Sequence, residues 1–234
     1  MSGLDGGKQD TALHLFRGLA RSYDRTADFA TMFQDRYWKK WAAQWVPNLK
    51  GALVLDLGCG TLLLEERLAG SGCSFVGLDL TAEMLGMGSS KELRNVELLV
   101  NGDGESLPFK DRTFDAVVGC YVAKYVQVPR LARELARVSR KGAPAILYDF
   151  AKPRGLPAPF LQAYIQGGLG VAGFLLEHAR RGSAFAYSRL PSLINNTHWD
   201  SEIVGAMEET GFETVTAERL TSGVVFGYCG RNLS

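Results

Sequence analysis

The chain has 234 residues, of which 46% are hydrophobic and 22% are charged, and its formal net charge is +1. This length fits one open α/β sheet with additional helices and allows a sizeable core. The sequence has no extended lysine and arginine stripe, which argues against nucleic-acid binding because phosphate tracking needs such a surface.

The first part of the chain predicts a helical cap that precedes the sheet. Met1 to Asp10 is polar without an apolar core, so we expect a frayed end and no secretory signal. Helical spacing of apolar residues then covers Thr11 to Tyr23 and Thr31 to Trp45. The second segment is rich in aromatic residues and is expected to pack against the core.

From Ala52 onward, strand and helix patterns alternate with short links, which implies a parallel, doubly wound sheet. After an insertion, a helix closed by Gly211 and an antiparallel pair of strands complete the pattern. The helices are expected at Glu65 to Ala69, Ala82 to Lys91, Leu131 to Val138 and Ser201 to Thr210, and the strands at Ser74 to Leu80, Val96 to Val100, Phe114 to Cys120, Ala143 to Phe150, Glu213 to Leu220 and Val224 to Cys229.

A glycine turn follows the first apolar strand, in the run Val54-Leu55-Asp56-Leu57-Gly58-Cys59-Gly60-Thr61. Gly58 and Gly60 let the backbone bend and approach a ligand, and the next helix offers its N-terminal amides. A dinucleotide site needs a third glycine where Leu63 stands, and Asp56 would repel a pyrophosphate. The turn therefore favours a cationic nucleoside with an amino-acid tail, such as S-adenosylmethionine.

Two further acids follow the next two predicted strands. Asp79 lies about 20 residues after the glycine turn, where an acid can accept both ribose hydroxyls. Asp103 lies in the turn Asn101-Gly102-Asp103, where it can meet the adenine edge. Any one of these acids alone could be a solvated turn residue, but acids at three successive strand ends favour a nucleoside site.

These motifs, together with Gly77-Leu78-Asp79, Leu107-Pro108-Phe109 and Phe114-Asp115, resemble the class I S-adenosylmethionine-dependent methyltransferases over about residues 50 to 150. The resemblance implies a Rossmann-like α/β fold with a seven-stranded, mostly parallel sheet and an antiparallel final strand. It places the glycine turn around the methionine part, Asp79 at the ribose, Asp103 by the adenine amine and Leu80 over the adenine. The residues expected to bind the donor are Tyr23, Asp56, Gly58, Cys59, Gly60, Asp79, Leu80, Gly102, Asp103 and Cys120.

Both ends of the chain resemble the quinone C-methyltransferases of the ubiquinone and menaquinone pathways. The similar segments are Phe16 to Asp24, Arg36 to Lys40 and Leu220 to Gly230. After the fourth strand that subfamily usually has Gly-Leu-Arg-Asn, whereas this chain has Tyr121-Val122-Ala123-Lys124-Tyr125. The acceptor could therefore differ while remaining an apolar ring compound.

Methyl transfer requires alignment of an in-line displacement and a group that removes or stabilises charge on the acceptor. Lys124, Tyr121 and Tyr125 follow the fourth strand, where the acceptor should meet the methyl group, and Lys124 could stabilise a phenolate. His198 is the best imidazole candidate for a base, although a histidine just before a helix can also be an ordinary loop residue. No histidine and carboxylate spacing suggests a metal, so none is expected.

The expected organisation is a single domain, with a helical cap at 1–48, a cofactor-binding core at 49–151, an apolar helical insertion at 152–198 that covers the substrate, and a C-terminal helix and strand pair at 199–234. The insertion is nearly long enough to span a bilayer, but its prolines and glycines favour two short helices over an apolar pocket. An ordinary buried helical pair and shallow membrane contact remain alternatives.

The four cysteines form no CxxC pair, which indicates reduced thiols and a cytoplasmic enzyme, with peripheral membrane contact left open. The expected partner is a small hydrophobic acceptor, and a homodimer is also left open. Two alternative functions remain: O- or N-methylation of another apolar metabolite or lipid headgroup, and donor binding without transfer.

Overall fold

The computed structural model describes residues 5–31, 33–46, 50–154 and 192–234. Their centre is a seven-stranded sheet in the order β3-β2-β1-β4-β5-β7-β6. The first five strands are parallel, and β7 is antiparallel to both β5 and β6. This order confirms the predicted doubly wound sheet with an antiparallel end. Most of the predicted insertion, residues 155–191, lies outside the described residues.

The elements alternate as the sequence predicts, with boundaries that differ by a few residues. The strands are β1 (Leu53–Leu57), β2 (Ser74–Asp79), β3 (Val96–Asn101), β4 (Ala116–Cys120), β5 (Pro144–Phe150), β6 (Phe212–Leu220) and β7 (Val225–Asn232). The helices are α1 (Asp5–Leu19), α2 (Tyr23–Ala30), α3 (Asp35–Ala43), α4 (Leu63–Arg67), α5 (Ala82–Ser89), α6 (Val128–Val138) and α9 (Trp199–Glu209), with 3₁₀ turns η1 (Ala20–Ser22), η2 (Ala123–Tyr125) and η3 (Thr221–Gly223).

Both faces of the sheet are covered, because successive residues of a strand point to opposite sides. Leu55, Val117 and Leu147 pack with residues of α6 and α9 on one face. Val54 and Ile146, their neighbours along the chain, pack with residues of α3 and α4 on the other face. The strands are apolar on both sides for this reason, as parallel strands between helical layers usually are.

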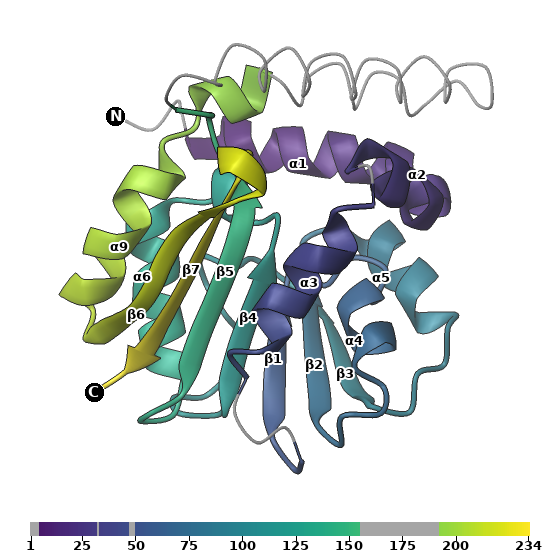
Figure 1. Ribbon diagram of the computed structural model, residues 1–234. Helices are drawn as coiled ribbons and strands as arrows, with labels where there is room; N and C mark the ends of the chain where they lie inside the picture. Colours follow the sequence, from purple (N-terminus) through teal and green to yellow (C-terminus); the bar gives the residue numbers. More distant parts are fainter. Residues whose placement is uncertain (1–4, 32, 47–49, 155–191) are drawn as a thin grey trace.

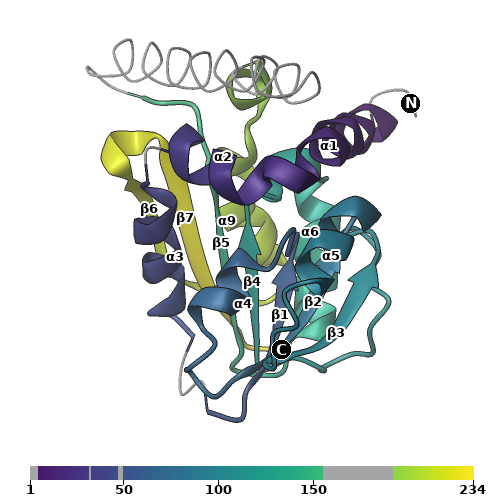
Figure 2. The ribbon, with the colours of Figure 1, turned by 90° about the vertical axis from the view of Figure 1, so that its right-hand side faces the viewer.

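The N-terminal helices form a cap over one edge of this core. α1 and α2 run across the end at which the parallel strands terminate, and α3 descends along the sheet (Figures 1 and 2). α3 is fixed to the far end of the chain by two indole groups. Trp38 Nε1 donates to Thr221 Oγ1 at 2.8 Å, and Trp41 Nε1 donates to Glu218 Oε1 at 2.8 Å.

Two expectations for the cap were wrong. The end predicted to be frayed is already helical from Asp5, and residue Gln9 makes a specific tertiary contact described below. The second predicted helix starts at Asp35 instead of Thr31, because Phe33 adopts a left-handed backbone conformation with φ of 62° that interrupts the helix. No helix of the described residues is long and apolar enough to cross a bilayer.

Candidate functional site

A cavity lies where the parallel strands end and α1 crosses them. It contains about 660 Å³ of space between protein atoms, a volume that includes the part open to solvent. Its lining brings together most of the predicted site residues with several from α1 and α5. The lining residues are Gln9, Ala12, Phe16, Tyr23, Leu57, Gly58, Gly60, Leu78, Asp79, Leu80, Thr81, Met84, Gly102, Asp103, Gly104, Cys120, Tyr121, Val122, Tyr125 and Val126.

The glycine turn forms one wall of this cavity. Gly58 and Gly60 have φ of 71° and 56°, a region that costs an L-amino acid about 1 kcal/mol or more. A Cβ at Gly60 would also lie 3.2 Å from Met84 Cε, which lines the same cavity. Leu62 continues the turn with φ of 65° and its buried side chain packs with Cys59. The turn therefore exposes bare backbone to the cavity, while the side chains of Cys59 and Leu62 pack into the core.

Asp79, at the end of β2, supports that turn directly. Its Oδ2 accepts a hydrogen bond from the Gly60 amide at 2.8 Å, and its Oδ1 accepts one from the Thr81 amide at 2.7 Å. Burial raises the pKa of Asp79, and the two amides act in the opposite direction. Each carboxylate oxygen keeps a second lone pair, so the group can still accept hydroxyl donors from the cavity.

Asp103, the acid predicted to lie near adenine, is covered by α1. Gln9 Nε2 lies 3.0 Å from both carboxylate oxygens of Asp103, and the Glu105 amide donates to Oδ1 at 2.8 Å. Asp103 therefore accepts from a primary amide, which is an N–H donor like the exocyclic adenine amine predicted for this acid. Gln9 was missed because its segment was predicted to be frayed.

Asp56 lies beneath the cavity and does not line it. It is buried beside Glu65 of α4, and no hydrogen bond joins Asp56 Oδ1 or either Glu65 carboxylate oxygen to another described residue. Burial raises the pKa of Asp56 well above its usual value and raises that of Glu65 to about 7. Two ionised carboxylates cannot bond to each other, so a shared proton is the arrangement that satisfies this pair.

This pair predicts a pH dependence of stability that one variant should remove. The pKa of Glu65 is raised from 4.5 to about 7. The contribution of the protonated Glu65 carboxyl to the stability of the folded state is therefore fully present below pH 4.5 and is lost as the pH rises through 7. We expect Glu65→Gln to be more stable than the wild type at pH 8 by about 1–3 kcal/mol, measured by urea unfolding. Glu97→Gln, at an exposed position, is the control. Parallel pH profiles for the wild type and Glu65→Gln would contradict the shared proton.

Tyr121 forms the cavity wall immediately after β4 and has φ of 62°. Its hydroxyl donates to Asp35 Oδ1 at 2.8 Å, and its ring stacks on Phe150 with centroids 5.4 Å apart. Asp35 is buried at the start of α3 and also accepts from Lys39 Nζ at 2.5 Å. Burial raises the pKa of Tyr121 well above its usual value, so this tyrosine stays a neutral hydrogen-bond donor.

Lys124 has a different environment from the one that a phenolate contact requires. It is buried outside the cavity lining, with Nζ 2.6 Å from Asp149 Oδ1 and 3.0 Å from the Tyr121 carbonyl oxygen. Burial lowers the pKa of Lys124, and Asp149 opposes that effect. Its ammonium also lies 4.4 Å from the ring centroid of Tyr125, which does line the cavity. Lys124 thus packs against the cavity-lining residue Tyr125 from outside the cavity.

The remaining predicted residues divide into two groups. Tyr23, Leu80, Gly102 and Cys120 line the cavity, whereas Cys59 is buried beside it. His198 is exposed just before α9, where its carbonyl accepts from Ser201, and it is not part of the lining. Within the described ranges, no group of three or more histidine, cysteine, aspartate and glutamate side chains could hold a metal ion.

The chain is similar to known proteins over most of its length. A model of the ubiE/COQ5 methyltransferase family matches residues 5–231. The chain is 31% identical over 229 residues to a demethylmenaquinone methyltransferase of Mycobacterium marinum, covering 97% of this chain and 95% of the relative. It is 29% identical over 215 residues to a protein of the same name from Tropheryma whipplei strain Twist, covering 90% and 87%.

Solved structures of methyltransferases share the fold. Magnesium protoporphyrin IX methyltransferase from Synechocystis, with bound S-adenosylhomocysteine, has a TM-score of 0.60 at 18% identity and covers 90% of this chain and 87% of its own. Geranyl diphosphate C-methyltransferase from Streptomyces coelicolor has a TM-score of 0.59 at 14% identity, with 85% and 80% covered. At these identities the likeness concerns the fold alone.

Proposed function

The chain belongs to the ubiE/COQ5 methyltransferase family and is an S-adenosylmethionine-dependent methyltransferase; from this premise we propose that it methylates a ring carbon of a demethylated quinone. The observation that carries the proposal is the relation to demethylmenaquinone methyltransferases over almost the full length of both chains. The cavity is consistent with it, because one part is polar and the part near α1 is aromatic.

The polar part fits the donor. Asp79 presents carboxylate oxygens for the ribose hydroxyls, Asp103 presents oxygens for an amine, and the glycine turn leaves room for the backbone to approach the methionine part. When bound, S-adenosylmethionine supplies an electrophilic methyl group on positively charged sulfur. The chain's own contribution is to align the two reactants and to exclude water, which can lower the barrier by about 7–11 kcal/mol.

The aromatic part fits a flat ring. Phe16 makes edge contacts with Tyr125, at a centroid distance of 5.7 Å, and with Tyr23, at 6.1 Å. Burial raises the pKa of Tyr125 well above its usual value, as it does for Tyr121. We propose that both tyrosines pack against the acceptor as neutral phenols, since neither group can take up a proton in that state near neutral pH.

A transfer assay with labelled donor tests the acceptor. Purified protein is incubated with methyl-labelled S-adenosylmethionine and a reduced demethylated naphthoquinone or benzoquinone, and the lipid extract is analysed by mass spectrometry and NMR. A new carbon-bound methyl on the naphthoquinone is the expected result, and an oxygen-bound methyl would move the reaction to O-methylation. Labelled donor that binds without transfer to either quinone would refute the proposed acceptor.

The apolar acceptor also suggests where the enzyme works. A hydrophobic quinone partitions into lipid, and we propose peripheral contact of the enzyme with the membrane surface for its uptake. The same assay, with the quinone supplied either in lipid vesicles or in detergent, distinguishes uptake of the quinone at the membrane surface from uptake without membrane contact. Faster transfer from vesicles, with protein that sediments with them, is expected for peripheral contact, and equal rates without sedimentation would oppose it.

A further inference from the structure

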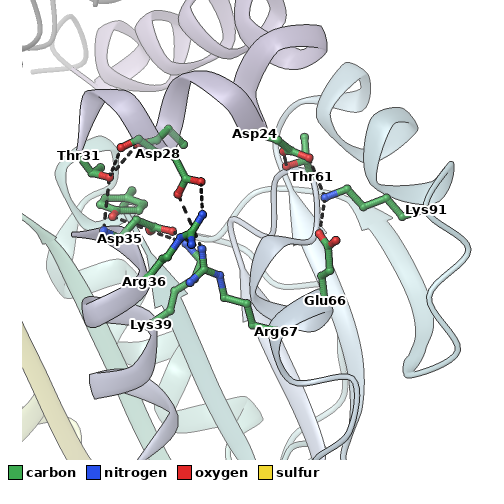
Figure 3. A network of polar contacts seen from close by, with 12 residues as sticks. Asp24, Asp28, Thr31, Asp35, Arg36, Lys39, Thr61, Glu66, Arg67 and Lys91 are labelled. Carbon is green, nitrogen blue, oxygen red and sulfur yellow. Dashed lines mark hydrogen bonds and ion pairs between the residues drawn. The ribbon is translucent and has the colours of Figure 1, made fainter. Parts of the chain in front are cut away.

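A set of polar contacts connects the cap to the glycine turn, and we name its four residues, Asp24, Thr61, Glu66 and Lys91, the clasp (Figure 3). The Thr61 hydroxyl donates to Asp24 Oδ1 at 2.5 Å. Lys91 Nζ lies 2.8 Å from Asp24 Oδ2 and 3.0 Å from Glu66 Oε2. The clasp therefore joins α2, the glycine turn, α4 and the segment after α5.

Three of the four elements that the clasp joins adjoin the cavity lining. Asp24 follows Tyr23, Thr61 follows Gly60, and the helix that ends before Lys91 carries Met84, all three neighbours being lining residues. Thr61 itself is buried, and its hydroxyl points to the cap instead of the cavity. Its turn is also held from below by the bond from the Gly60 amide to Asp79. The clasp thus fixes the glycine turn from above, while Asp79 fixes it from below.

The two halves of the clasp differ in their exposure to solvent. The side chains of Lys91, Asp24 and Glu66 are 19%, 41% and 53% exposed, so salt screens the ion pairs and each adds little free energy. The bond between Thr61 and Asp24 is charge-assisted and involves a buried hydroxyl, which makes it the stronger contact. A second connection, in which Arg67 of α4 lies 3.5 Å from Asp35 Oδ2, keeps α4 and α3 together without the clasp.

We propose that Asp24 is a positioning residue for donor binding, which acts through Thr61 to hold the glycine turn and Tyr23 in register around S-adenosylmethionine. Asp24 does not line the cavity, so its effect is transmitted by the Thr61 hydroxyl. This inference concerns the donor and does not depend on the quinone proposed as acceptor.

Matched variants of the full chain separate the contacts. Thr61→Val removes the hydroxyl and keeps the side-chain shape, whereas Thr61→Ser keeps the hydroxyl. Asp24→Asn keeps an acceptor oxygen for Thr61 and loses the ion pair with Lys91, and Asp24→Ala loses both. Lys91→Met loses only the ion pairs. The affinity for S-adenosylmethionine and S-adenosylhomocysteine is measured by titration calorimetry at low and high salt, and folding is monitored by thermal unfolding.

We expect Thr61→Val and Asp24→Ala each to weaken donor binding roughly 10-fold, and their combination to weaken it no further. Thr61→Ser, Asp24→Asn and Lys91→Met should stay within about 3-fold of the wild type, with the difference for Lys91→Met disappearing at high salt. Wild-type affinity in Thr61→Val would overturn the proposal, as would additive losses in the double variant. Should Asp24→Ala fail to fold, Thr61→Val alone decides, because it removes no charge. A failed quinone assay would leave all these affinities unchanged.

Discussion

Asp79→Ala is expected to weaken S-adenosylmethionine binding by at least about 2 kcal/mol, roughly 30-fold, because hydrogen bonds to a charged acceptor contribute about 1.5–3 kcal/mol. In the proposed donor site, the substitution removes the carboxylate that would accept from both ribose hydroxyls. It also releases the amides of Gly60 and Thr81, so the wall of the cavity loses its support from below. Titration calorimetry with S-adenosylhomocysteine, which has no reactive methyl group, measures the loss without turnover.

Two further variants show whether the loss of donor affinity in Asp79→Ala comes from the Asp79 carboxylate. Asp79→Asn retains one acceptor oxygen and should bind the donor with intermediate affinity. Asp111→Ala is the matched control, because the Asp111 side chain is 75% exposed and pairs only with Arg137 in the described part of the chain. Donor affinity in Asp79→Ala equal to that of Asp111→Ala would show that Asp79 does not contact the ribose.

Lys124→Met is expected to be the most destabilising substitution, lowering the free energy of unfolding by about 3–5 kcal/mol. Asp149 is fully buried, and removal of the ammonium would leave its carboxylate with only the amides of Lys124 and Phe150 as partners. Urea unfolding at neutral pH measures this change. Removing both charges should cost much less, so Lys124→Met with Asp149→Leu should recover most of the stability.

The double variant also separates stability from catalysis. A chain that folds without either charge permits a direct measurement of what the Lys124 ammonium contributes to methyl transfer. If Lys124→Met alone is as stable as the double variant, the predicted penalty for a buried Asp149 carboxylate without its ammonium partner is wrong. A large loss that only the second substitution restores supports the ion pair.

The parts of the site that the sequence predicts are those set by local geometry. The glycine turn, Asp79 and Asp103 follow consecutive strands, and parallel strands bring their carboxyl ends to one edge of the sheet. The parallel, doubly wound arrangement of the sheet follows from the same alternation of strands and helices. These features depend on neighbours in the chain or on adjacent strands, so a pattern of residue types is enough to reveal them.

The contacts that the sequence did not predict join residues far apart in the chain. Lys124 was interpreted as an acceptor contact, and its pairing with Asp149 depends on β5 lying beside the turn after β4. The bond from Tyr121 to Asp35 spans 86 positions and brings α3 against that turn. The Gln9 contact with Asp103 spans 94 positions and requires a helix where the sequence is polar. Side-chain pairing of this kind depends on the assembled fold.

The two indole bonds that fix α3 to the other end of the chain have a consequence for protein synthesis. Trp38 and Thr221 are 183 positions apart, and Trp41 and Glu218 are 177 apart. A ribosome that adds about 5–20 residues per second needs roughly 10–35 s to make the intervening chain. The cap helix is therefore translated among the first elements, yet it obtains these partners only when β6 and η3 emerge. During that interval the tryptophan-bearing face of α3 lacks its partners, which makes it a natural site for chaperone contact on the nascent chain.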